Sequence, residues 1–248
     1  MIKNRETKVP SRVSHLRYWS AMLCGLLMTA CGTPQADTTT DTAAAFSIRE
    51  GDLLFQDSDC GAFCDAIEAV TVGINDWEFS HVGLVMRSDS GTLKVMEAIS
   101  AGVVLTPLDS FLHRSFDEAQ QPKVVVGRLK SEHQSLIPDA IDFIHSKMDA
   151  AYDVYFNIEN DSFYCSELIH LAFRAANDDQ PIFETPRMTF KAPDTDSTFA
   201  IWTDYFADLN YPVPEGEVGL NPGSMSRSPY IEIVHQYGTP STAPTPTQ

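Results

Sequence analysis

The sequence is short of positive charge. Only 17 of its 248 residues are Lys or Arg, against 34 Asp and Glu, which gives a formal net charge of −17 at pH 7. Five of the basic residues fall within the first 30 positions, so the rest of the chain carries 12 basic against 33 acidic residues. A surface of that charge repels phosphate backbones and anionic head groups, so we expect no nucleic-acid partner.

The N-terminal region lacks an apolar run long enough to span a membrane. The run at residues 21–30 covers ten positions, whereas a spanning helix needs about 20 residues. It follows a basic stretch that ends at Arg17, and a basic segment before a short apolar one is typical of a secretory signal. We therefore expect residues 1–30 to be a signal peptide.

The end of this run carries a second signal. Residues Met28 to Gly32 resemble the lipobox of bacterial lipoproteins, in which the cysteine becomes the lipidated first residue of the mature chain. We expect Cys31 to carry the lipid and to anchor the protein in a membrane. With Gly32 rather than Asp next to it, the resemblance implies the outer membrane, facing the periplasm. The alternative is an ordinary signal followed by an unrelated cysteine.

Two segments have compositions that do not support a packed core. Residues 31–45 are rich in Thr, Ala and Asp and predict a flexible tether, and residues 239–248 are rich in Thr and Pro and predict a disordered tail. Between them, residues 46–238 show no repeat and no linker. We expect one domain there, and the sequence does not indicate its oligomeric state.

The pattern of apolar residues within the domain predicts an α+β fold with an antiparallel sheet packed against helices. Several short segments have the composition and spacing of strands: 51–56, 81–86, 93–99, 102–105, 123–129 and 230–234. Apolar residues at helical spacing predict helices over 60–74, from Pro138 to Met148, and over 165–176.

Cysteine is scarce, and each copy can be considered separately. Of five cysteines, Cys24 falls in the signal peptide and Cys31 in the lipobox. Cys60 and Cys64 are four residues apart, which suits a disulfide in an oxidising compartment. Cys165 is then left over, either as a reactive thiol or as a small buried hydrophobic residue.

A histidine and an acid are expected to meet across a hairpin. If the loop between the strands at 81–86 and 93–99 is centred on Asp89, His81 lies directly opposite Glu97. The carboxylate can then bind one imidazole nitrogen and leave the other free to act as a base. A register shifted by one residue would place the two side chains on opposite faces.

Cys165 stands at the expected start of an apolar helix. The unpaired N–H groups and the dipole of a helix start favour a thiolate and can hold an oxyanion. Together with an imidazole oriented by an acid, such a cysteine has the general arrangement of a nucleophile. The alternative is that both residues are structural, as strand histidines and isolated cysteines often are.

Several motifs, taken in order, resemble the permuted papain-like amidases of the NlpC/P60 superfamily, the YiiX/YebB-like group. The motifs are Gly51–Gln56, Phe79–Val85, Met96–Ala98, Thr106–Leu108, Tyr152–Asp153 with Phe156, and Tyr164–Leu168. The resemblance implies a circularly permuted papain-like fold and hydrolysis of an amide bond through a thioacyl intermediate. It implies that Cys165 is the nucleophile, His81 the base and Glu97 the orienting acid. Tyr164 and Asp153 fall in matching motifs and are expected at the substrate.

One competing nucleophile lies elsewhere. The segment Asp59–Phe63 superficially resembles the nucleophile motif of unpermuted members of the superfamily. In those enzymes, however, the cysteine precedes the Gly-Asp-Leu strand, whereas Cys60 follows it here. We therefore favour Cys165.

Other chemistry finds little support. The remaining histidines show no metal-ligand spacing and no Gly-rich phosphate loop occurs, so we expect no metal and no cofactor. The leading hypothesis is a lipid-anchored cysteine hydrolase that cleaves peptide or amino-acyl amide bonds, including those of peptidoglycan. Alternatives are a lipid acyl hydrolase or acyltransferase with the same three residues, and a non-catalytic binding lipoprotein. An apolar groove beside Cys165 favours lipids, and convergent polar groups favour peptides.

Overall fold

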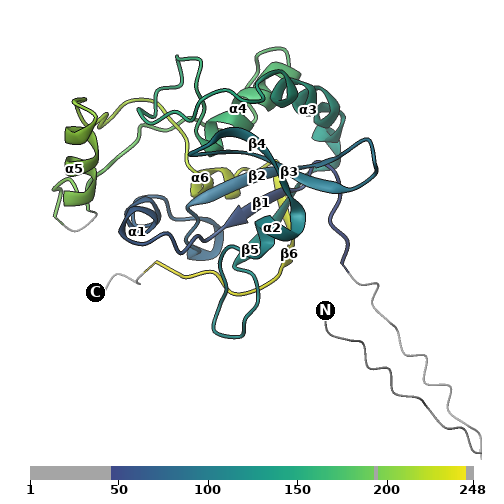
Figure 1. The fold of residues 1–248 in the computed structure, drawn as a ribbon, viewed down its shortest axis with the longest axis horizontal. Coiled ribbons are helices and arrows are strands. Elements are labelled where there is room, and N and C mark those ends of the chain that lie inside the picture. The colour runs from purple at the N-terminus through teal and green to yellow at the C-terminus, as the bar shows by residue number, and fades with distance from the viewer. Residues whose placement is uncertain (1–45, 193–194, 244–248) are drawn as a thin grey trace, which may run out of the picture. The chain divides into compact units, whose positions relative to one another are not determined.

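The computed structural model describes residues 46–192 and 195–243 (Figure 1). The predicted signal peptide, the lipobox with Cys31 and the whole of the tether lie outside the described residues. Among the helices of the described part, none is long and apolar enough to cross a membrane.

A six-stranded antiparallel sheet organises the domain. The strand order is β4-β3-β2-β1-β5-β6. The strands are β1 (Leu53–Gln56), β2 (His81–Arg87), β3 (Leu93–Ile99), β4 (Gly102–Pro107), β5 (Val124–Leu129) and β6 (Ile231–Gln236). Their Val-rich, β-branched sequences suit a pleated sheet buried on both faces. The predicted α+β class with an antiparallel sheet is confirmed.

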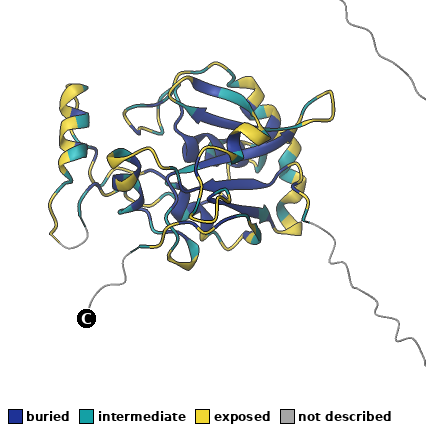
Figure 2. Ribbon diagram, turned by 60° about the horizontal axis from the view of Figure 1, so that its bottom comes forward, coloured by how far each residue is buried: buried dark blue, intermediate teal, exposed yellow. Residues whose placement is uncertain are grey.

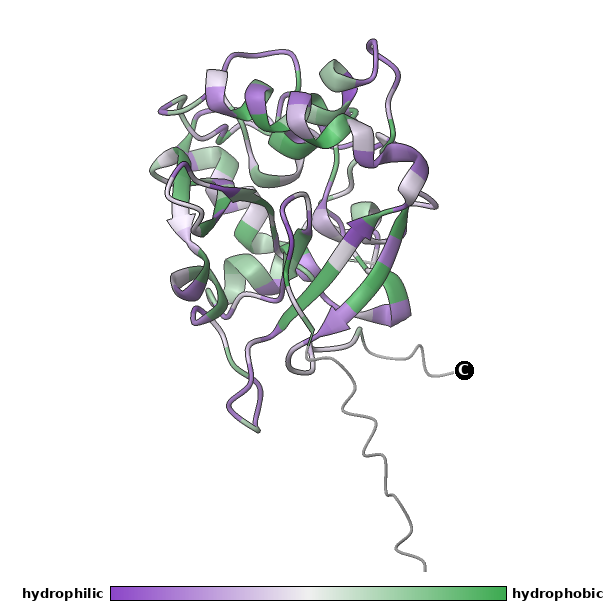
Figure 3. Cartoon of the chain, turned by 90° about the vertical axis from the view of Figure 1, so that its right-hand side faces the viewer, coloured by the Kyte–Doolittle hydropathy of each residue, from purple (hydrophilic) through white to green (hydrophobic). Residues whose placement is uncertain are grey.

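Each face of the sheet has its own hydrophobic core. On one face, side chains such as Phe55, Leu84 and Met96 pack under α3 (Ile137–Ser146) and α4 (Cys165–Ala176). On the other face, Val85 and Val95 pack with others against α2 (Leu108–Leu112). Figure 2 shows the strands as buried and the outer sides of the helices as exposed, and Figure 3 shows the matching division between hydrophobic and hydrophilic residues.

The remaining helices are short. They are α1 (Ala62–Glu68), α5 (Ala200–Asp208), α6 (Pro222–Ser226) and two 3-10 helices, η1 (Ile74–Asp76) and η2 (Ser131–Leu136). Between α1, α5 and the loops near them, a third core forms that is rich in aromatic residues. This aromatic cluster consists of Ala66, Phe156, Tyr164, Phe190, Trp202 and Phe206.

The predicted helix over 60–74 is shorter than expected. Helix α1 ends at Glu68, and the N–H groups of Val70 and Thr71 bond three residues back, as in a turn. Gly73 then packs against Phe79, with no room for a side chain. The apolar residues after Glu68 continue the helical spacing although they lie outside the helix, because they also face the interior of the domain.

The hairpin between β2 and β3 has a different register from the predicted one. Leu84 pairs with Met96 and Val85 with Val95, so the loop is centred on Ser90 rather than Asp89. The loop tightens at Gly91, whose φ of +81° lies in the left-handed region. This change moves the pairing by two residues, which keeps His81 and Glu97 on the same face of the sheet.

The C-terminal segment is more ordered than its composition predicts. The N–H groups of Thr239 and Ser241 donate to Asp117 at 2.9 Å and to Asp57 at 2.7 Å. Thr242 also forms a bridge with Trp77. The prediction of a disordered tail is therefore wrong for residues 239–243, because carboxylates of the domain bind their backbone.

Candidate active site

Cys165 is the first residue of helix α4. Tyr164 precedes it with extended backbone angles, and the Tyr164 N–H donates to the carboxylate of Glu167 at 3.0 Å, which fixes the start of the helix. The apolar side chains of α4, such as Leu168 and Ile169, are fully buried against the sheet. Helix α4 packs across β2 and β3, so the position of the thiol relative to those strands is fixed.

His81 is the first residue of β2, and its side chain lies on the face of the sheet that α2 covers. Its Nε2 lies 2.6 Å from Oε2 of Glu97, which leaves Nδ1 as the nitrogen available to Cys165. The His81 ring packs 5.8 Å from that of Phe111. Gly83 allows this packing, because a Cβ there would lie 2.4 Å from Val95 and 3.3 Å from the Phe111 ring.

The environment of His81 favours its protonated form. Burial lowers the pKa of His81, but hydrogen bonds and charge interactions with Cys165 and Glu97 outweigh burial and raise the pKa to about 9. An imidazolium beside Cys165 stabilises a thiolate.

Glu97 is fully buried and has all of its partners within the protein. Besides His81, its carboxylate accepts hydrogen bonds from the hydroxyl of Thr106 and from both Nη atoms of Arg114, the Nη1 bond measuring 2.7 Å. Burial raises the pKa of Glu97, but the bonds from His81, Arg114 and Thr106 outweigh it and lower the pKa to about 2. Glu97 therefore stays ionised and orients His81.

Arg114 is the residue at this site that sequence reasoning missed. It follows α2, lies 5.0 Å above the Phe111 ring, and its side chain is 31% exposed. A buried carboxylate does call for a cationic partner. Spacing along the chain gave no means to choose among the 12 basic residues that follow position 30.

The two other predicted site residues have distinct positions. Tyr164 lines the pocket beside Cys165, and its hydroxyl accepts the N–H of Leu220 at 3.0 Å. Asp153 is fully buried and accepts the N–H groups of Tyr155 at 2.8 Å and Asn157 at 2.6 Å. Asp153 thus holds the loop that presents Phe156 to the pocket, and does not itself line the pocket.

The competing cysteine is not a free thiol. Cys60 and Cys64 form a disulfide at the start of α1, with their Cα atoms 5.4 Å apart. Among the described residues, Cys165 is the free cysteine.

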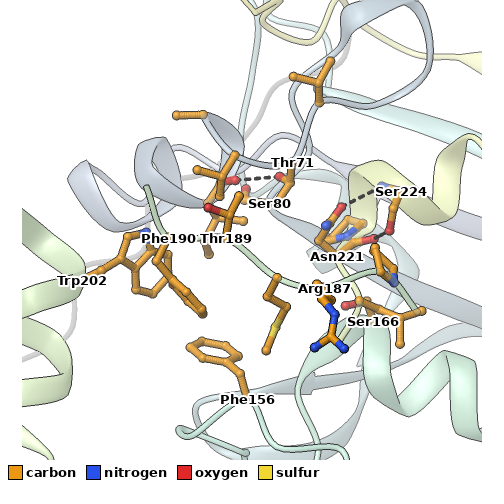
Figure 4. A pocket seen from close by; sticks show the side chains of 18 of the residues that line it. Thr71, Ser80, Phe156, Ser166, Arg187, Thr189, Phe190, Trp202, Asn221 and Ser224 are labelled. Carbon is orange, nitrogen blue, oxygen red and sulfur yellow. Dashed lines mark hydrogen bonds between the residues drawn. The ribbon is translucent and has the colours of Figure 1, made fainter. Parts of the chain in front are cut away.

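A pocket of about 610 Å³ opens beside Cys165 (Figure 4). Most of its lining is apolar and comes from α1, the loop at 186–192, α5 and the segment before α6. The apolar lining includes Ile67, Val70, Phe156, Met188, Phe190, Trp202 and Leu220. Polar lining residues include Ser80, Ser166, Arg187 and Asn221. A site of this size can hold an extended apolar group next to the thiol.

The described residues bring together no group of three His, Cys, Asp or Glu side chains suited to a metal ion. What they do bring together is an imidazole held by a buried acid, a cysteine at a helix start and a pocket beside it.

Comparisons with known proteins bear on the fold and the family. No curated protein sequence matches the chain. The fold is similar to a solved structure described as the metalloprotein YiiX from Escherichia coli O157:H7, with a TM-score of 0.60 and 21% identity, covering 77% of this chain and 98% of that one. Residues 47–235 match the family described as permuted papain-like amidase enzymes, YaeF/YiiX, C92. The chain therefore belongs to this family of permuted papain-like amidases.

Proposed function

We propose that the protein is a cysteine hydrolase that cleaves amide bonds, with Cys165 as nucleophile, His81 as base and Glu97 as the acid that orients His81. The observation that carries the proposal is the contact of 2.6 Å between His81 and a fully buried Glu97, with Cys165 close enough to His81 to raise its pKa. A carboxylate in that position serves to hold an imidazole for proton transfer.

The reaction follows from these positions. Nδ1 of His81 takes the thiol proton, and the sulfur attacks the carbonyl carbon of the substrate. N–H groups at the start of α4 stabilise the resulting oxyanion. His81 then gives its proton to the leaving amine as the C–N bond breaks, which leaves a thioacyl enzyme. Water, deprotonated by His81, attacks the thioester, releases the acid and restores the thiol.

A second candidate is hydrolysis or transfer of lipid acyl groups by the same three residues. It is favoured by the apolar lining of the pocket beside Cys165, which suits an acyl chain better than a peptide backbone. An alcohol then takes the place of the amine as leaving group. A purely binding role has less support, because a buried carboxylate that holds an imidazole suits proton transfer better than binding alone.

We also propose that the protein is a lipid-anchored member of the NlpC/P60 superfamily in the cell envelope. The motif at residues 28–32 supports the anchor, with Cys31 as the lipidated residue. Mass spectrometry of the mature protein should find Cys31 at the N-terminus with a diacylglycerol group. An unmodified Cys31, or a mature chain that starts elsewhere, contradicts the anchor but not the catalytic assignment.

Hydrolysis of a substrate panel tests the activity. The panel contains amides and esters with short and long acyl chains and short peptides. We expect turnover of at least one amide by the wild type, no turnover by Cys165→Ala, and near-normal turnover by the paired control Cys60→Ser/Cys64→Ser. Turnover of esters alone selects the second candidate. Equal activity of Cys165→Ala and the wild type contradicts the assignment of the nucleophile.

A further inference from the structure

The pocket beside Cys165 has a polar side as well as its apolar lining. Ser166 directly follows the nucleophile, and its side chain is fully buried. Its hydroxyl has no hydrogen-bond partner among the described residues, although Ser166 lines the pocket. Figure 4 shows Ser166 and Arg187 on the same side of the cavity. A buried hydroxyl without a partner is costly unless a bound molecule supplies the missing hydrogen bond.

Arg187 is positioned to bind a negative charge. Arg187 is solvent-exposed and lines the pocket, and its Nη1 donates to the carbonyl oxygen of Gly216 at 2.7 Å. Lys191, another cation of the lining, is paired with Asp196 at 3.0 Å. Arg187 makes no ion pair with any carboxylate of the described residues.

Two acids line the pocket, Asp196 and Glu215, and neither forms an ion pair with Arg187. The carboxylate of Glu215 accepts the N–H of Phe190 at 2.8 Å. The chain has 34 acidic and 17 basic residues. A guanidinium that lines a pocket without a carboxylate partner is therefore a local exception to the negative charge of the chain. Planar, forked donors of this kind are suited to carboxylate and phosphate groups.

We propose that the pocket binds an N-acylated amine that carries an anionic group near the amide bond, with Arg187 and the hydroxyl of Ser166 binding that group. The acyl chain occupies the apolar part formed by Phe156, Phe190 and Trp202. Because Ser166 is adjacent to Cys165, an anion that reaches its hydroxyl lies within a few bonds of the carbonyl under attack. N-acyl amino acids, with a carboxylate beside the amide, have this layout, and so do N-acyl amines that bear a phosphate.

This inference rests on the proposed amidase activity and goes further by naming the leaving group. It also accounts for an apolar pocket in a family of amidases, since the same substrate has an apolar acyl chain and an amide bond.

The test compares three substrates with the same acyl chain: N-lauroylglycine, its neutral carboxamide, and N-lauroyl phosphoethanolamine. Wild type should hydrolyse at least one anionic substrate with a kcat/KM roughly tenfold or more above that of the carboxamide, as expected for a charged hydrogen bond. The anionic substrate with the larger increase in kcat/KM over the carboxamide shows whether a carboxylate or a phosphate is the natural group.

Variants identify the residue responsible. Arg187→Met should lose the preference for the anion, whereas Arg187→Lys should keep part of the preference. The matched control is Arg87→Met, because Arg87 also donates from Nη1 to a backbone carbonyl oxygen, that of Gly91, at 2.7 Å, and does not line the pocket. This control should retain the preference.

Binding to Cys165→Ala separates failure of this inference from failure of the proposed activity. Calorimetry should show tighter binding of an anionic substrate than of the carboxamide, and the difference should vanish in Cys165→Ala/Arg187→Met. If wild type hydrolyses none of the three, the amidase proposal fails for this class while the binding data still test the anion site. Equal binding of anionic and neutral compounds, or a preference that survives Arg187→Met, overturns the inference.

Discussion

The catalytic cluster and the aromatic cluster are neighbouring parts of the molecule that are built differently. In the catalytic cluster, a buried carboxylate on β3 binds His81, Thr106 and Arg114, so hydrogen bonds fix each side chain. In the aromatic cluster, rings meet mostly edge to face, for example Phe190 and Trp202 at 5.1 Å. The first arrangement tolerates little change, whereas the second can accept other shapes of side chain or ligand.

The catalytic cluster and the aromatic cluster control different properties of the protein. Regular strands and a helix hold the reacting groups, which allows proton transfer over short distances. Short helices and loops between residues 186 and 227 form most of the wall of the pocket, and they decide what fits beside Cys165. Changes in the catalytic cluster should therefore alter the rate for every substrate, and changes in the aromatic cluster should alter the choice of substrate.

The largest effect after loss of the nucleophile is expected for His81→Ala. Without the base, kcat should fall by roughly 10²–10⁴ on all substrates alike. The double variant Cys165→Ala/His81→Ala should be hardly worse than either single variant, because the two residues act as a unit. Glu97→Gln should show a smaller loss, since the imidazole remains. His145→Ala, a change at an exposed histidine on α3, is the control for kinetic assays.

Arg114→Met should come next, with a loss of roughly tenfold or more in kcat. Removal of the guanidinium favours proton binding by the groups around it, so both limbs of the pH–rate profile should move to higher pH. Arg114→Lys keeps the charge and should restore the profile in part. A profile that stays in place while the protein unfolds more easily would show that Arg114 serves stability alone.

Phe190→Leu should change selectivity rather than catalysis. It alters the wall of the pocket, so KM should rise several-fold for long acyl chains, with kcat on short substrates nearly unchanged. Phe173→Leu is the matched control, because Phe173 is a buried residue of α4 and does not line the pocket. Both variants should lose about 1 kcal/mol of stability. Equal shifts in chain-length preference for the two would contradict the division between the clusters.

Glu68, on α1, is a buried acid close to Ser80 and Asp57, and it affects stability. Burial raises the pKa of Glu68 from 4.5 to about 8. A folded-state pKa above the unfolded value means that stability is greatest when the group is protonated and falls as the pH rises through 8. The raised pKa of His81 acts in the same direction between 6.5 and 9.

The melting temperature should therefore fall as the pH rises from 6 to 9. Glu68→Gln should flatten this dependence, because the neutral amide replaces the protonated acid. Glu118→Gln, at an exposed position, should leave it unchanged. A melting temperature of Glu68→Gln that falls as steeply as that of the wild type would refute the role of Glu68.

The smallest effect is expected from the paired change Cys60→Ser/Cys64→Ser. The disulfide closes a loop with a sequence separation of four residues, so its loss should cost about 2 kcal/mol or less in the chain-entropy description. Catalysis should remain nearly intact, which denaturant unfolding and kinetic assays can check together. A large loss of turnover would mean that α1 takes part in the chemistry.

Sequence reasoning was most successful where local rules apply. The start of α4 at Cys165 follows from the periodicity of apolar residues. The shared face of His81 and Glu97 was also predicted correctly, because the predicted hairpin pairing was wrong by two residues, and a shift by an even number keeps each side chain on its face. Arg114 and the pocket were beyond reach because they depend on contacts between distant segments. Tyr164 contacts Leu220, 56 residues away, and no local pattern marks such a pair.

The central claim is that Cys165 attacks the substrate to form a thioacyl enzyme. Its most direct test is mass spectrometry of the enzyme quenched during turnover of an activated acyl substrate, followed by peptide mapping. The account predicts one acyl group per chain, located on Cys165, which forms at a greatly reduced rate in His81→Ala and is absent from Cys165→Ala. An acyl group on another residue, or full turnover by Cys165→Ala, would contradict it.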